Sequence, residues 1–173
     1  MSLMDYIKNK ARADKKTIVL AEGNEPRTVA AAEIVKKEGI ADVILLGDEK
    51  IIRAAGNYDI ADIPIINPAE SEWKEDFAQT YFEMRKNKGM SIEQARETML
   101  NPLYFGAMMV KKDIVDGMVA GAVNSTSNVI LAAVRVIKAA PGIKSVSSCF
   151  IMESPIKEFG DGQDGLRRLR IYN

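Results

Sequence analysis

The sequence predicts an α/β fold, a three-layer α/β/α sandwich built on a mostly parallel sheet. Short apolar runs rich in β-branched residues alternate along the chain with longer stretches of helical period. Glycine or proline stands at most of the boundaries between them. Strands that alternate with helices form βαβ units, in which the strands lie parallel and the helices cover the sheet. The predicted architecture is therefore Rossmann-like.

Five apolar runs are predicted as strands. Pro64 weakens the third run and places it near an edge of the sheet, because proline cannot donate to the hydrogen-bond ladder. The predicted strands span residues 17–21, 41–46, 63–66, 115–121 and 145–152.

The helices between these strands carry start and stop signals. Pro26 suits a first helical turn, where its missing N–H costs nothing, and Gly39 is a favoured helix stop. Ser91, with Gln94 three residues later, is typical of a capped helix start. The predicted helices span residues 3–13, 26–38, 48–55, 70–87, 91–100, 102–112 and 125–139.

The composition is that of an ordinary globular domain. The 173 residues are 47% hydrophobic and 28% charged, enough for one domain with a substantial core. The 24 basic residues balance the 24 acidic ones, so charge gives no reason to expect nucleic acid or an anionic membrane as a partner. No apolar run approaches the ~20 residues of a membrane helix. We expect a cytoplasmic protein.

Cys149 is the single cysteine and the chain has no histidine. An internal disulfide and a Cys/His zinc site both need more such residues, and we expect no metal. Without histidine, the commonest general base is absent. Acid–base chemistry must then use carboxylates, tyrosine, lysine or groups outside this chain.

The first candidate anion site is the loop at residues 22–27, between a predicted strand and a helix. Backbone N–H groups at a helix start favour anions, Arg27 adds a bidentate donor, and Gly23 allows close approach to the backbone. An ordinary capped helix start with a surface arginine is the alternative. Ligands of parallel sheets usually lie beyond the carboxyl ends of the strands. That rule indicates this loop, residues 121–126 and the segment after Met152.

The second candidate is the loop that Gly121 opens, with Asn124, Ser125 and Thr126. Such a loop can surround a phosphate or a thioester with N–H and O–H donors. It contains neither a P-loop nor a dinucleotide-binding pattern. The alternative is that Asn124 or Ser125 simply caps the next helix.

The third candidate is a basic cluster at a helix end, where Arg85, Lys86 and Lys88 precede Gly89. Such cations bind phosphate or simply compensate the helix dipole. Composition and spacing therefore indicate an α/β domain with an anion site, and name no reaction.

A series of motifs resembles the phosphate acetyltransferases, also called phosphotransacetylases. Their order and spacing match from about Asp5 to about Gly160. The matching segments are Ala21-Glu22-Gly23 with Arg27, residues 84–89 (Met-Arg-Lys-Asn-Lys-Gly), residues 101–106 (Asn-Pro-Leu-Tyr-Phe-Gly), residues 116–126 and residues 136–152.

The resemblance implies a phosphotransacetylase/isocitrate-dehydrogenase-like fold and reversible acetyl transfer between coenzyme A and inorganic phosphate. It implies acetyl-CoA, phosphate and acetyl phosphate as substrates, a role in acetate metabolism, no covalently bound cofactor and a homodimer. Arg85 matches the family's phosphate-side arginine, and Ser125 and Thr126 match a loop that faces the cleft between two domains. The substrate- or phosphate-binding candidates are Arg85, Ser125, Thr126, Asn124, Arg27 and Gly121.

The sequence departs from the family pattern in two ways. An arginine usual in the helix after the Ser-Thr loop is replaced by Leu131, and Arg135, one helical turn later, is the candidate substitute. Family members are also about twice as long, and the remaining half carries the serine, arginine and aspartate assigned to catalysis. We therefore expect a truncated protein, weakly active or inactive alone. Its divisions would be residues 1–143 as a first α/β domain, 144–160 as the start of a second, and 161–173 as an atypical tail.

Two other functions remain open. One is a noncatalytic α/β domain that binds phosphate or a nucleotide. The other is a phosphate acyltransferase that uses a longer acyl chain, because the acyl pocket cannot be read from this sequence.

Overall fold

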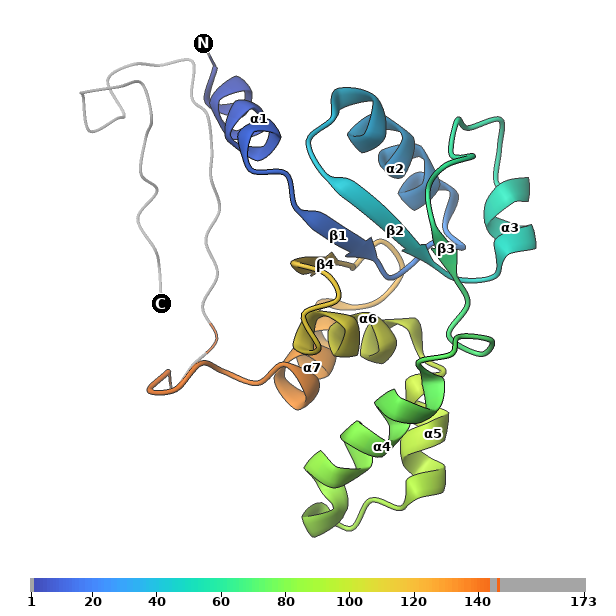
Figure 1. Cartoon of the computed structure of the whole chain (residues 1–173), viewed down its shortest axis with the longest axis vertical. Helices are drawn as coiled ribbons and strands as arrows, with labels where there is room; N and C mark the ends of the chain where they lie inside the picture. Colours follow the sequence, from blue (N-terminus) through green and yellow to red (C-terminus); the bar gives the residue numbers. More distant parts are fainter. Residues whose placement is uncertain (1, 144–145, 147–173) are drawn as a thin grey trace.

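The computed structural model describes residues 2–143 and 146. At its centre lies a parallel four-stranded sheet in the order β3-β2-β1-β4 (Figure 1). In the register, Val19 of β1 lies opposite Ile44 on one side and Met118 on the other. The strands are β1 (Thr17–Leu20), β2 (Asp42–Leu46), β3 (Ile65–Ile66) and β4 (Gly117–Val119). The predicted α/β fold with a parallel sheet is confirmed.

Helices lie on both faces of this sheet. Figure 1 shows α2 and α3 on one face and α6 and α7 on the other, with the α4–α5 pair extending beyond α6 and α1 set apart from the sheet. The helices are α1 (Leu3–Ala13), α2 (Pro26–Glu38), α3 (Glu49–Ala54), α4 (Lys74–Arg85), α5 (Ile92–Met99), α6 (Pro102–Lys111) and α7 (Thr126–Val136), with a 3-10 turn at Lys86–Lys88 after α4.

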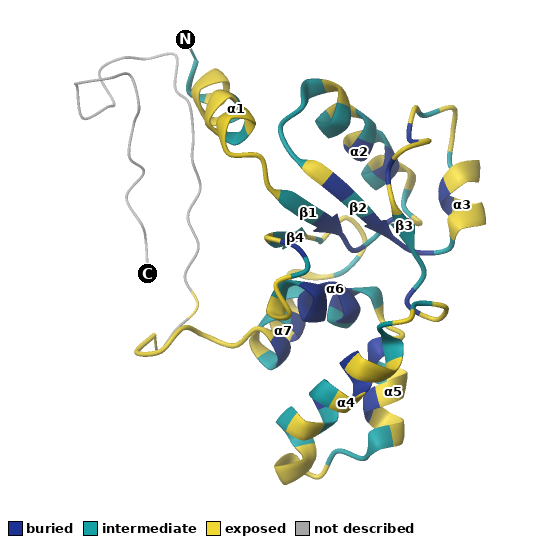
Figure 2. Cartoon of the chain, in the orientation of Figure 1, coloured by how far each residue is buried: buried dark blue, intermediate teal, exposed yellow. Residues whose placement is uncertain are grey.

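Two hydrophobic cores separate the three layers. Successive side chains of a strand point to opposite faces, so Val19 joins the core under α6 and α7 while Leu20 joins the core under α2 and α3. Leu46 and Leu45 divide in the same way. Figure 2 shows buried residues along β1, β2 and α6, whereas α1 buries none.

The predicted helix signals act as expected. Pro26 is the first residue of α2, and Gly39 ends that helix in the left-handed conformation, with φ of +64°. At α5, the Gln94 N–H donates to Ser91 Oγ at 3.2 Å and the Ser91 N–H donates to Gln94 Oε1 at 3.0 Å. These three boundaries therefore follow from local backbone geometry and hydrogen bonding.

Several predicted boundaries are wrong, and the strand predicted over residues 115–121 spans only Gly117–Val119. The helix predicted from residue 70 begins at Lys74, because Asn67 first forms a turn in which its carbonyl accepts the Glu70 N–H at 3.1 Å. The helix predicted to residue 139 ends at Val136, and Lys138 has φ of +70°. The third strand forms only over Ile65–Ile66, at the sheet edge as predicted.

Some predictions lie outside the described residues. These are the strand at 145–152, except for Val146, and the divisions at 144–160 and 161–173.

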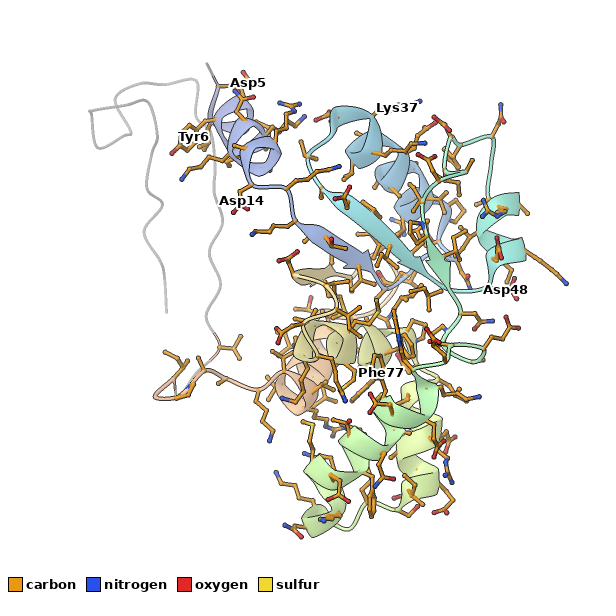
Figure 3. All side chains as sticks on the ribbon, viewed as in Figure 1. Asp5, Tyr6, Asp14, Lys37, Asp48 and Phe77 are labelled. Atoms are coloured by element: carbon orange, nitrogen blue, oxygen red, sulfur yellow. The ribbon has the colours of Figure 1, made fainter. Side chains whose placement is uncertain are left out.

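Aromatic side chains join α4 to α6. The Phe77 and Phe105 ring centroids lie 4.8 Å apart, and Figure 3 shows Phe77 where the two helices meet. One turn along α4, the Tyr81 ring meets Tyr104 of α6 edge to face, with centroids 5.9 Å apart. These pairs fix the end of α4, and with it the position of Arg85.

Candidate functional site

The carboxyl ends of β1 and β4 meet through a single carboxylate, that of Glu22. Since the two strands are parallel neighbours, the loops that follow them emerge side by side. The Gly121 and Ala122 N–H groups donate to Glu22 Oε2 at 2.8 and 2.6 Å. The Val123 and Asn124 N–H groups donate to Oε1 at 3.1 and 2.7 Å, and Asn124 Nδ2 donates to the same oxygen at 2.8 Å.

These hydrogen bonds keep Glu22 ionised. Burial alone would raise the pKa of this carboxyl, but donation from Asn124, Ala122 and Val123 outweighs burial and lowers the pKa from 4.5 to about 2. The predicted N–H-rich loop is thus a true anion nest. Its occupant in this structure is the protein's own carboxylate.

The loop after β1 is also tied to the end of β2. The Gly23 N–H donates to the Leu46 carbonyl at 2.9 Å, and Asn24 Oδ1 accepts the Asp48 N–H at 2.9 Å. A hollow of about 350 Å³ opens beside these contacts, and its walls include Glu22, Asn24 and Leu103. The hollow therefore lies at the carboxyl edge of the sheet, where ligands of parallel sheets bind.

Arg27 joins the two loops from the opposite side. Its Nη2 donates to the Ala122 carbonyl at 2.7 Å and its Nε pairs with Glu25 at 2.5 Å. The side chain remains 73% exposed and lines a second hollow of about 210 Å³. Arg27 therefore supports the loop and also faces solvent.

Ser125 and Thr126 lie at the start of α7, and both are exposed. Ser125 is the N-cap, because its Oγ accepts the Asn128 N–H at 3.3 Å. Asn124 instead binds Glu22. The capping alternative is thus confirmed for Ser125, while Gly121, with φ of +110°, forms the turn before the nest.

The remaining candidate, Arg85, lies at the carboxyl end of α4. It is half-buried, and its Nε is buried without a hydrogen-bond partner among the described residues. Tyr81 lies one turn earlier on the same helix and contacts Tyr104. Arg135 of α7 donates from Nη1 to the Tyr104 hydroxyl at 3.1 Å.

The predicted site residues thus form two groups. Sequence reasoning missed the central role of Glu22, although its position directly after a strand was a usable signal. It also missed Tyr81 and Tyr104, whose meeting depends on how α4 packs on α6. The strand-end group holds Arg27, Gly121, Asn124, Ser125 and Thr126, and the second group holds Arg85.

Neither a metal-ligand cluster nor a membrane-spanning helix is found in the described part of the chain. There, no three acidic or cysteine side chains gather as metal ligands would. Within the same part, every helix is too short or too polar to cross a membrane.

The fold and the two groups define a parallel α/β domain with polar loops at the strand ends. A family model described as Phosphate acetyl/butaryl transferase matches residues 2–166. The chain belongs to that family of transferases.

Curated relatives and a solved structure agree with this family assignment. Phosphate acetyltransferases of Thermoanaerobacterium thermosaccharolyticum and Acetivibrio thermocellus are each 50% identical, over 93% and 92% of this chain. A phosphotransacetylase structure from Streptococcus pyogenes superposes with a TM-score of 0.83, at 34% identity over 90% of this chain. The chain covers 49%, 48% and 49% of these three proteins, about half of each.

Proposed function

We propose that this chain supplies the first-domain part of an enzyme that moves an acetyl group reversibly between coenzyme A and inorganic phosphate. The observation that carries the proposal is 50% identity to a phosphate acetyltransferase over 93% of the chain. The strand-end hollow and the half-buried Arg85, whose Nε has no hydrogen-bond partner among the described residues, support it. Residues 1–143 would form the first domain, and the catalytic serine, arginine and aspartate would come from sequence outside this chain.

The proposed reaction needs a proton acceptor, an oxyanion site and a phosphate site. A base removes the thiol proton of coenzyme A, the thiolate attacks the carbonyl carbon of acetyl phosphate, and phosphate leaves as the tetrahedral intermediate collapses. In this chain, Arg85 would hold the phosphate. Ser125 and Thr126 would offer exposed hydroxyls toward the substrate.

Three strand-end candidates would act mainly through loop shape. The N–H groups of Gly121 and Asn124 already donate to Glu22, so they are not free for substrate in this arrangement. Arg27 holds the Ala122 carbonyl from the other side. We assign these residues to positioning the loop on which Ser125 and Thr126 lie.

The wider setting is part of the same proposal. The enzyme would be a cytoplasmic homodimer of acetate metabolism, with coenzyme A and acetyl-CoA as substrates and no covalently bound cofactor. Neither nucleic acid nor a membrane would be a partner. A longer acyl group is the second candidate, because the family description names butyryl as well as acetyl transfer.

A chimera tests the function. Residues 2–166 of this chain replace the matching half of the Thermoanaerobacterium thermosaccharolyticum relative, and coenzyme A-dependent turnover of acetyl and butyryl phosphate is measured. We expect acetyl turnover within about tenfold of that relative, and weak or no turnover by the 173-residue chain alone. A folded chimera that binds coenzyme A yet turns over neither substrate would refute the proposal. Faster butyryl transfer would favour the second candidate.

A further inference from the structure

The free edge of β3 lies away from the two groups of candidate site residues. Among the described strands, β3 pairs with β2 alone and stands at an edge of the sheet (Figure 1). The Leu45 N–H donates to the Pro64 carbonyl at 2.9 Å. The Gly47 N–H donates to the Ile66 carbonyl at 3.1 Å. Because successive residues of a strand point their backbone polar groups to opposite sides, those of Ile65 face the open edge, where another strand can add.

A hollow of about 360 Å³ borders this edge and combines apolar with acidic side chains. We call it the β3-edge hollow, and its walls include Ile65, Glu70, Glu72 and Trp73. Trp73 is half-buried, and its ring stacks on Phe77 with the centroids 6.0 Å apart. An indole ring held in this way attracts a guanidinium group, which stacks on aromatic faces.

Two carboxylates at the β3-edge hollow have no cation in the described structure. Within residues 2–143 and 146, neither Glu70 nor Glu72 forms an ion pair, and both are exposed. The third acid, Glu49, already pairs with Arg53 at 2.8 Å. The Lys74 ammonium donates to a backbone carbonyl at 2.8 Å. Acidic side chains elsewhere on the described surface often hold a basic partner already, as in the pairs Asp62–Lys36, Glu75–Arg96 and Asp76–Lys112.

The chain itself contains a segment of matching chemistry. Residues 166–172 have the sequence Leu-Arg-Arg-Leu-Arg-Ile-Tyr, which interleaves three arginines with branched aliphatic side chains and contains no acid. This basic segment lies outside the described residues. Residues 144–165 connect it to the described domain, and such a length of chain spans up to about 75 Å when extended. A domain of this size has a radius of gyration of only about 14 Å, so the connection is long enough to reach β3.

We propose that the basic segment, residues 166–172, binds the β3-edge hollow of the same molecule. Its arginines pair with Glu70 and Glu72 and stack on Trp73, while its aliphatic side chains and backbone meet Ile65. In such strand addition, main-chain hydrogen bonds give affinity and side-chain contacts give specificity. The same molecule is the favoured source because a tether raises the local concentration of the segment. The proposal goes beyond acetyl transfer and does not depend on it.

Fluorescence of Trp73 tests the proposal on the 173-residue chain, because Trp73 is its single tryptophan. We expect the triple variant Arg167→Gln, Arg168→Gln, Arg170→Gln to raise acrylamide quenching about twofold, since no guanidinium group then covers the ring. The unaltered chain at about 1 M salt, where the Debye length is about 3 Å, should show the same rise. Quenching that is equal in the unaltered chain and the folded triple variant would overturn the proposal.

A charge exchange locates the binding surface. Glu70→Arg with Glu72→Arg should also raise quenching, and adding the three tail changes Arg167→Glu, Arg168→Glu and Arg170→Glu should reverse that rise. Glu93→Gln with Glu97→Gln removes two exposed acids of α5 and is the matched control, with quenching unchanged. Thermal unfolding confirms that each variant is folded.

Three outcomes of these measurements would contradict the proposal. One is a charge exchange that leaves quenching high, and another is an equal rise in the α5 control. The third is protection of Trp73 that increases with protein concentration, because it would assign the basic segment to a second copy. No substrate takes part in this readout, so its result is independent of turnover by the chimera.

Discussion

Asn124 donates two hydrogen bonds to one oxygen of Glu22, from its backbone N–H at 2.7 Å and from its side-chain Nδ2 at 2.8 Å. Glu22 lies two residues after the end of β1, and Asn124 directly precedes the N-cap of α7. A contact between residues 102 positions apart thus fixes where α7 begins. Because Arg135 lies on α7, the direction of that helix also determines where its guanidinium reaches.

Replacing Glu22 by glutamine should destabilise the fold. In this variant, the backbone N–H groups that donate to Glu22 would lose their charged acceptor. Some of them would face the amide NH₂ of glutamine instead. Hydrogen bonds to charged groups contribute about 1.5–3 kcal/mol each, and we expect Glu22→Gln to lower the free energy of unfolding in urea by about 3 kcal/mol in total. Glu49→Gln is the matched control, because Glu49 forms only an exposed ion pair with Arg53, and such pairs contribute about 0.5 kcal/mol. Equal losses in the two variants would contradict the assigned role.

The same carboxylate should make stability depend on pH in the acid range. The pKa of Glu22 is about 2 in the folded chain, below the 4.5 of an ordinary glutamate. A depressed folded-state pKa means that the stabilisation is complete above about 4.5 and is lost as the pH falls toward about 2. The stability difference between the unaltered chain and Glu22→Gln, measured in urea, should therefore shrink across that interval. A difference that stays constant from neutral pH to about pH 2 would exclude this linkage.

The sequence predicts the parts of this fold that local chemistry determines. Pro26 marks a helix start through its fixed φ and missing N–H, whereas Gly39 and the Ser91–Gln94 pair mark helix ends by hydrogen bonds within a few residues. These boundaries could therefore be predicted. The turn at Asn67 competes with helix formation through its own hydrogen bonds, which is why the predicted start of α4 was too early. Whether the Asn67 turn or an earlier start of the helix forms depends on how Trp73 and Phe77 pack. That packing involves residues distant in the sequence.

The candidate site likewise has one part that could be predicted from the sequence and one part that could not. The loops at 22–27 and 121–126 could be predicted because parallel strands bring their carboxyl ends to one edge. The pairing of Glu22 with the Asn124 loop depends on β1 and β4 being neighbours, an order that periodicity does not reveal. The Tyr81–Tyr104 contact likewise depends on α4 crossing α6. Contacts between residues distant in the sequence could therefore not be predicted.

Replacing Ser125 by alanine should weaken α7 at its start. The Ser125 Oγ accepts the Asn128 N–H, and loss of such an N-cap costs about 1 kcal/mol. Ser127→Ala is the matched control, because Ser127 lies inside α7, where alanine is the better helix former. Urea unfolding should show a loss for Ser125→Ala and no loss for Ser127→Ala. A larger loss of stability for Ser127→Ala than for Ser125→Ala would exclude Ser125 as the N-cap.

Replacing Gly23 by alanine should disrupt the strand-end group. An added Cβ would lie 2.6 Å from the Leu46 carbonyl oxygen, the atom that accepts the Gly23 N–H, and 2.9 Å from Ile52 Cδ1. Backbone at the end of β2 would have to move, so we expect a loss of roughly 2–4 kcal/mol in urea unfolding.

Gly106→Ala is the matched control for Gly23→Ala. There the added Cβ meets Met118 Sδ at 2.9 Å, the flexible end of a side chain that can shift, and alanine also favours the helix. We expect this variant to stay within about 1 kcal/mol of the unaltered chain. Equal losses of stability in the two variants would mean that the Leu46 carbonyl of β2 shifts as readily as the Met118 side chain. The loop holding Glu22 would then be less firmly tied to the sheet than its hydrogen bonds indicate.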